Sequence, residues 1–201
     1  MSLSTTLFLI TLLVPQDAEQ RDRQETPGAQ TEALHRTTPK TWDYLLPGDH
    51  WRPLVSPLVL DGVEFAVRLE NSTSLHLDTN ADGQTERHVT SPRARVQLQA
   101  DGGGRHVLRI RRAGDAWECS NGEILTGRVE GVRLQIIDLN GDGRFDEYGR
   151  DAMVVGEKVG ASYLSRVATI SDRLFHLTVN TSAGKVSTRP YSGPTAHLNV
   201  K

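Results

Sequence analysis

The feature that most constrains the fold is a succession of short apolar or alternating segments separated by turn residues. Gly, Asp and Asn stand between most of these segments, and such residues favour tight turns. No long window shows the apolar spacing of an amphipathic helix. The sequence therefore predicts an all-β fold, a single antiparallel β-sandwich or barrel-like domain. The expected strands lie at residues 58–70 (interrupted by the turn pair Asp61-Gly62), 96–99, 107–111, 116–119, 124–129, 132–137, 153–155, 166–170 and 174–179, and two final strands are expected around Pro190 and Pro194.

Composition divides the chain into three regions. Residues 7–14 (LFLITLLV) form an apolar run that Pro15 ends, which is typical of an export signal and too short to span a bilayer. We therefore expect a signal peptide at residues 1–18. Residues 19–40 are polar and rich in Gln, Arg, Thr and Glu, which predicts a disordered linker. The β domain is expected at residues 41–201, in the periplasm or outside the cell.

Charge and cysteine content exclude several classes of protein. The chain has 23 Lys and Arg against 25 Asp and Glu, a formal net charge of −2. A nucleic-acid-binding protein would show a basic excess, so we expect no nucleic-acid partner. We also expect no membrane span. The single cysteine, Cys119, excludes an intrachain disulfide and a cysteine-based zinc site, and we expect it to be a core residue on a strand.

Two acidic segments share one spacing of oxygen-bearing side chains. Residues 138–147 (DLNGDGRFDE) carry Asp or Asn at positions one, three, five and nine and glycine at position six. Residues 78–86 (DTNADGQTE) repeat this spacing, with Glu at position nine. Calcium is a hard cation that takes six to eight oxygen ligands, and a glycine lets a tight loop turn those oxygens inward. We name residues 78–86 the first acidic loop and residues 138–147 the second acidic loop.

Both loops resemble the D-x-N-x-D-G-x-x-D/E calcium loop of EF-hands, dockerins and FG-GAP repeats. The wider layout resembles exported bacterial proteins in which such loops join the strands of a β module. Two departures from an EF-hand are visible: no helix flanks either loop, and position twelve is Val89 or Gly149 in place of the bidentate Glu. Asp151 could supply a later ligand to the second loop. The resemblance implies calcium ligands at Asp78, Asn80, Asp82, Gln84 (backbone), Glu86, Asp138, Asn140, Asp142, Arg144 (backbone) and Asp146.

These observations favour an exported calcium-binding β module with a structural or binding role and no catalytic residues. An envelope protein or a polysaccharide is the kind of partner that such a module would bind. Two alternatives stay open. One is a small metal- or carboxylate-dependent hydrolase, using a cluster of His76, Asp78, Glu86 and His88 on one face of a hairpin. The other is a carbohydrate-binding module with an exposed platform of Trp42, Tyr44, Trp51 and Trp117.

Overall fold

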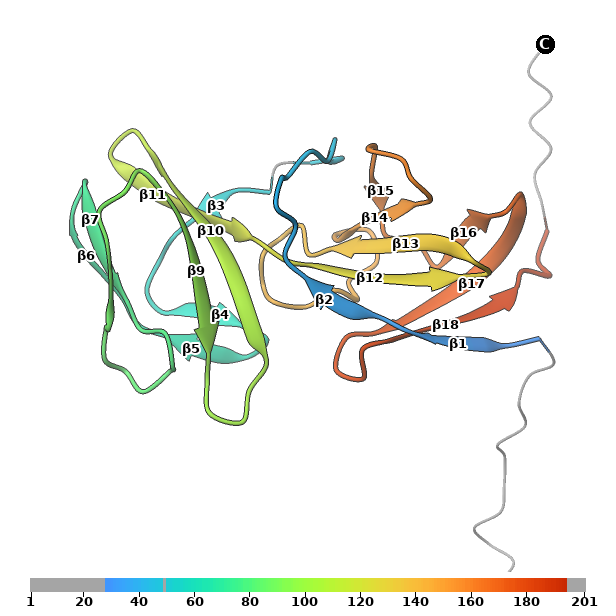
Figure 1. Cartoon of the computed structure of the whole chain (residues 1–201), viewed down its shortest axis with the longest axis horizontal. Helices are drawn as coiled ribbons and strands as arrows, with labels where there is room; N and C mark the ends of the chain where they lie inside the picture. The colour runs from blue at the N-terminus through green and yellow to red at the C-terminus, as the bar shows by residue number, and fades with distance from the viewer. Residues whose placement is uncertain (1–27, 49, 195–201) are drawn as a thin grey trace, which may run out of the picture.

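The computed structural model describes residues 28–48 and 50–194. The expected signal peptide, residues 1–18, lies outside the described residues. The predicted all-β class is confirmed: the described elements are strands, and the strands pair in antiparallel sheets. None of the described segments forms a helix with the length and apolar character that crossing a bilayer requires. Figure 1 shows the strands gathered in two halves placed side by side.

The first half contains strands β3 to β11 in three sheets, ordered β3-β11-β10-β9, β4-β5 and β6-β7-β8. Its core gathers apolar side chains from all three sheets, including Phe65, Leu98 and Trp117. Cys119 is buried in this core on β11, as expected. The strands are β3 (Arg52–Pro53), β4 (Leu58–Leu60), β5 (Val63–Phe65), β6 (Val67–Asn71), β7 (Ser74–Leu77), β8 (Arg87–Val89), β9 (Arg93–Gln99), β10 (Arg105–Ala113) and β11 (Ala116–Asn121).

The second half contains the remaining strands in two sheets, ordered β1-β18-β17-β16 and β15-β14-β13-β12-β2. Phe145, Ile136 and Phe175 are buried in the core that these sheets share. The expected strands at residues 124–129 and 132–137 match β12 and β13. The strands are β1 (Gln30–Ala33), β2 (His35–Thr37), β12 (Ile124–Val129), β13 (Val132–Ile137), β14 (Ala152–Val155), β15 (Ser162–Tyr163), β16 (Val167–Ile170), β17 (Arg173–Asn180) and β18 (Lys185–Pro190).

The predicted disordered linker at residues 19–40 is wrong for its later part, because β1 and β2 form there. These strands occupy sheet edges, where β1 pairs with β18 and β2 with β12. All four β1 residues are exposed, so the pairing uses backbone hydrogen bonds and leaves no apolar alternation in the sequence. Leu34, between the two strands, is buried in the second half's core. The ordered β domain therefore includes residues 30–37 and begins before residue 41.

Contacts between the halves converge near the second acidic loop. Glu123, between β11 and β12, is buried and forms ion pairs with Arg36 of the second half and Arg105 of the first. The backbone N–H of Asp61, in the β4–β5 turn, donates to the carbonyl of Asp142 at 2.6 Å. The second acidic loop is thus part of the junction between the halves.

Candidate metal centres

Each acidic loop connects two strands that are antiparallel neighbours. The first acidic loop joins β7 to β8, and the second joins β13 to β14. In both, the first aspartate directly follows the last strand residue: Asp78 follows Leu77, and Asp138 follows Ile137. Both aspartates are buried, with 0% and 2% of their surface exposed. The sequence repeat therefore occupies equivalent places in two different sheets.

The first aspartate organises both loops in the same way. In the first loop, Asp78 accepts hydrogen bonds from the backbone N–H groups of Ala81 at position four and Gly83 at position six. In the second, Asp138 accepts from Gly141 and Gly143, at the same two positions. The backbone thus curls around one carboxylate in each loop.

Positions three and five are also equivalent in the two loops. The amide oxygen of Asn80 accepts the N–H of Asp82, and the carboxylate of Asp82 accepts the N–H of Gln84. The second loop repeats both bonds, from Asp142 to Asn140 and from Arg144 to Asp142. A carboxylate or amide oxygen retains a second lone pair after accepting one hydrogen bond. These side chains can therefore hold the loop and coordinate a cation together.

The backbone dihedral angles match as well. Position four has a positive φ in both loops, 64° at Ala81 and 72° at Gly141. Position six does too, with 84° at Gly83 and 90° at Gly143. Left-handed backbone is easily adopted by glycine and costs another residue about 1–2 kcal/mol. The shared D-x-N-x-D-G pattern therefore specifies one loop conformation.

The carboxylates of the first acidic loop converge. Asp78, Asp82 and Glu86 each offer an oxygen, and these three oxygens lie within 4.8 Å of one another. Glu86 also accepts hydrogen bonds from the backbone N–H and the hydroxyl of Thr79. Burial alone would raise the pKa of Asp78, but the N–H donors of Gly83, Asn80 and Ala81 hold it below its ordinary value. The loop therefore presents charged oxygens to one point.

Asp146 and Asp151 have different partners in the second acidic loop. The carboxylate of Asp146, the expected ligand at position nine, lies 3.3 Å from the exposed Arg144 guanidinium. The buried Asp151 instead accepts the backbone N–H groups of Leu139 and Glu147. The structure describes every residue from 138 to 151. Among these residues, no three acidic side chains bring their oxygens within 4.8 Å of one another. Asp151 thus accepts the backbone N–H of position two, Leu139, as Glu86 accepts that of Thr79 in the first loop.

Burial sets the electrostatics of the second loop. It raises the pKa of Asp138, and the nearby Asp142 raises it further, against the hydrogen bonds from Gly143 and Gly141. Burial also raises the pKa of Asp151, with Asp138 and Asp142 adding to the effect. Each acid is therefore easier to protonate than a solvated aspartate. A bound cation would relieve the same repulsion.

The second acidic loop packs against the first half of the molecule, and this packing restricts it in a way that does not apply to the first acidic loop. A Cβ at Gly143 would lie 2.9 Å from the His106 ring and 3.0 Å from the backbone nitrogen of Asp61. The carbonyl of Gly141 accepts a 2.6 Å hydrogen bond from Arg52 of β3. A Cβ at Gly83 would meet nothing within 4 Å. The second loop is therefore enclosed, and the first is open to solvent.

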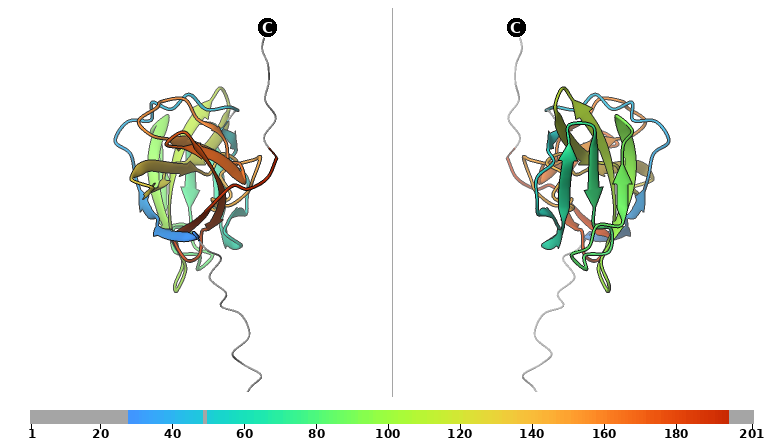
Figure 2. Two further views of the ribbon diagram at one scale, coloured as in Figure 1. Left: turned by 90° about the vertical axis from the view of Figure 1, so that its right-hand side faces the viewer. Right: turned by 90° about the vertical axis from the view of Figure 1, so that its left-hand side faces the viewer.

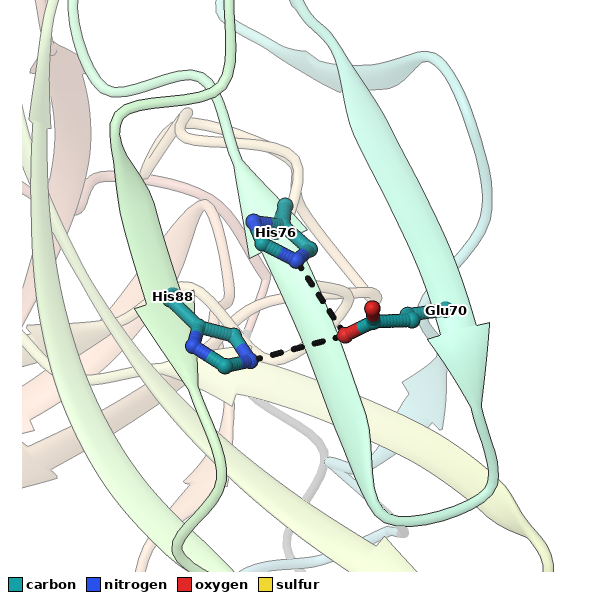
Figure 3. A group of neighbouring side chains, drawn as sticks. All are labelled: Glu70, His76 and His88. Atoms are coloured by element: carbon teal, nitrogen blue, oxygen red, sulfur yellow. Dashed lines mark hydrogen bonds and ion pairs between the residues drawn. The ribbon is translucent and has the colours of Figure 1, made fainter.

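The predicted cluster of His76, Asp78, Glu86 and His88 divides into two groups. Asp78 and Glu86 belong to the acidic loop, whereas His76 and His88 face each other in register on β7 and β8. Glu70 of β6, which the sequence did not single out, completes the histidine group. Figure 3 shows these three side chains on adjacent strands. Four surface depressions on the described residues include none of the three.

The aromatic residues do not form the platform expected of a carbohydrate-binding module. Trp117 is buried in the core of the first half. Trp42 and Trp51 are partly buried, and the Arg109 guanidinium lies over both rings, 3.9 Å and 5.1 Å from their centroids. Tyr44 meets Trp42 edge-on at 5.5 Å. The two indole faces are thus stacked with a cation of the chain itself.

Comparison with known protein families, curated proteins and solved structures finds no match to this chain.

Proposed function

We propose that this protein is an exported calcium-binding β module in which the two acidic loops hold calcium ions that stabilise the fold. The observation that carries the proposal is the shared scaffold of the loops. Two segments sixty residues apart use the same hydrogen bonds at positions one, three and five, and both have a positive φ at positions four and six. Their oxygens are of the type that calcium prefers.

The two ions would have different consequences. The first loop connects β7 and β8 at the end of one half, so an ion there would stabilise one sheet. The second loop contacts Arg52 and Asp61 of the other half, so an ion there would also fix the junction. This arrangement supports a structural role for calcium, in a module whose binding partner would be an envelope protein or a polysaccharide.

The affinity typical of extracellular calcium sites sets the size of the expected rise in the thermal midpoint. Extracellular calcium modules bind with dissociation constants of roughly 0.1–1 mM. At tenfold excess over that constant, each ion stabilises the folded state by about 1.4 kcal/mol. For a domain of this size, each kcal/mol raises the midpoint of thermal unfolding by about 2–4 °C. Two ions should therefore raise the midpoint by about 5–10 °C.

The test is thermal unfolding of the protein in EDTA, in calcium at several millimolar and in magnesium at the same concentration. Calcium should raise the midpoint and magnesium should not, because the smaller ion demands a more rigid octahedral site. The double variant Asp78→Asn, Asp82→Asn should lose the part of the midpoint shift that comes from the first loop. The double variant Asp138→Asn, Asp142→Asn should lose the part that comes from the second loop. Equal midpoints in EDTA and calcium would overturn the proposal.

A further inference from the structure

The three-stranded sheet β6-β7-β8 has one buried and one exposed face. Leu75, Leu77 and Val89 point into the core of the first half. His76 and His88 alternate with them and face outward, 19% and 49% exposed at the side chain. The right-hand view of Figure 2 shows this sheet facing the viewer at the end of the molecule. The outer face is therefore accessible to an ion from solution.

A β-bulge brings the third member to the histidines. The register of β6 against β7 shifts between Leu69 and Asn71, and Glu70 lies at that shift. A single carboxylate oxygen of Glu70, Oε2, lies 3.3 Å from Nε2 of His76 and 3.7 Å from Nε2 of His88. Figure 3 shows both distal nitrogens directed at this carboxylate. Bulges re-aim side chains in this way next to functional sites.

Neighbouring residues hold the carboxylate in place. The buried hydroxyl of Ser74 donates to the same oxygen of Glu70 at 2.8 Å. The side-chain oxygen of Asn71 accepts the backbone N–H groups of Thr73 and Ser74, which fixes the turn between β6 and β7. Groups that orient a ligand from behind are a regular part of metal sites.

We propose that Glu70, His76 and His88 form a surface site for a transition-metal ion of the zinc type. Two imidazole nitrogens and one carboxylate suit zinc or copper, whereas calcium takes oxygen ligands. Three protein ligands leave one tetrahedral position open to solvent, the arrangement found in catalytic rather than structural zinc sites. Its three ligands are different residues from the oxygen ligands of the first acidic loop, although that loop joins the two strands that carry His76 and His88.

Coordination of one ion by both rings requires one ring to turn out of its present stacked orientation. The two imidazoles are stacked, with centroids 4.4 Å apart and planes within 6°. Zinc–nitrogen bonds of about 2.0–2.1 Å at a tetrahedral angle place two ligand nitrogens roughly 3.4 Å apart. His88 is half exposed on β8, so its ring can rotate to converge with His76 on one ion. Arg68 is the register partner of His76 on β6, so its positive charge is on the same face of the sheet and would oppose binding.

The test is a zinc titration of the full chain against a chromophoric chelator, in millimolar calcium so that the acidic loops are occupied. We expect one saturable zinc ion per chain. His88→Gln should abolish it and Glu70→Gln should weaken it at least tenfold. Arg68→Gln should strengthen it, because a repulsive charge is removed. The control His176→Gln changes a histidine of β17, in the other half, and should bind zinc as the unmodified chain does.

Cobalt(II) supplies a readout of geometry, since a tetrahedral site gives visible absorption that is intense for this ion. That absorption should appear at one equivalent and disappear in His88→Gln, whose thermal midpoint without metal should stay unchanged. Zinc binding that survives Glu70→Gln at full affinity, or is lost in Asp78→Asn, Asp82→Asn, would overturn the site. The absence of saturable binding would overturn it as well.

Discussion

The backbone N–H of Asp61 donates a 2.6 Å hydrogen bond to the carbonyl of Asp142, and this bond joins the two halves of the molecule. Asp61 lies in the turn between β4 and β5, and Asp142 is position five of the second acidic loop. The carbonyl points out of the loop to the neighbouring half, whereas the side chain points into the loop and accepts the N–H of Arg144. An ion at the loop would therefore act directly on the junction.

The two loops should respond differently to alanine at position six. Gly143→Ala should destabilise the fold by about 2–4 kcal/mol, because a positive φ is combined with close contacts to His106 and the Asp61 backbone. Gly83→Ala should cost only about 1–2 kcal/mol, since its φ is similar but the space is open. Chemical denaturation of both variants in calcium measures the difference. Equal losses would contradict the enclosed position of the second loop.

Asp151 should matter more than Asp146 for calcium at the second loop. Asp151 is buried beside Asp138 and accepts the N–H groups of Leu139 and Glu147, whereas Asp146 is directed at the exposed Arg144. We expect Asp151→Asn to weaken calcium binding at least tenfold and Asp146→Asn to change it less than threefold.

Calorimetric titration in an Asp78→Asn, Asp82→Asn background, which silences the first loop, isolates the second. The ligand assignment from the sequence pattern predicts the opposite order, so the experiment decides between the two. A larger loss in Asp146→Asn would show that the loop closes around position nine when calcium binds.

Without calcium, stability should fall as the pH rises from 5 to 8. Burial and the neighbouring acids raise the pKa of Asp138 to about 7 and that of Asp151 to about 8, against an ordinary value of about 4. Between the ordinary pKa and the raised pKa, the folded state binds more protons than the unfolded state. The free energy of unfolding therefore decreases as the pH increases through this range. Thermal midpoints in EDTA at pH 5, 6, 7 and 8 measure this trend.

His106 changes the pH dependence of stability in the opposite direction, so its effect must be separated from that of the two aspartates. Burial and then Arg36 lower its pKa, so its contribution to stability is lost as the pH falls below about 6.5. Asp151→Asn removes one acid and leaves His106 in place, so the difference between the two pH profiles isolates Asp151. Parallel profiles for the two proteins in EDTA would contradict the proposed trend.

The buried ion pair of Glu123 should stabilise the junction substantially. Its side chain is 1% exposed and lies 3.0 Å from Arg105 and 3.5 Å from Arg36. Glu123→Gln removes the negative charge between two guanidinium groups and should cost about 2–4 kcal/mol. Glu157→Gln is the matched control, because Glu157 pairs with Arg133 at the surface and its side chain is 76% exposed. That change should cost less than about 1 kcal/mol. Similar losses in the two variants would show that the junction does not depend on Glu123.

The sequence predicted the elements whose causes are local. β12 and β13 show apolar patterning around the turn at Glu130 and Gly131, both with positive φ. In both acidic loops, the backbone hydrogen bonds accepted by the side chains at positions one, three and five span six residues or fewer, so the D-x-N-x-D-G pattern carries this part of the loop conformation. β1 and β2 escaped prediction because edge strands can pair through their backbone alone, without an apolar pattern.

By itself, then, the sequence determined the all-β class and the conformation of two equivalent acidic loops. Only the tertiary structure decided which loop is enclosed, that the buried Asp151 accepts the N–H of Leu139 while Asp146 lies against Arg144, and that Glu70 joins His76 and His88. The physical reason is the distance along the chain over which the interactions act. A turn is governed by neighbours along the chain, whereas burial and the meeting of side chains from separate strands depend on register, bulges and packing, which arise only when the sheets assemble.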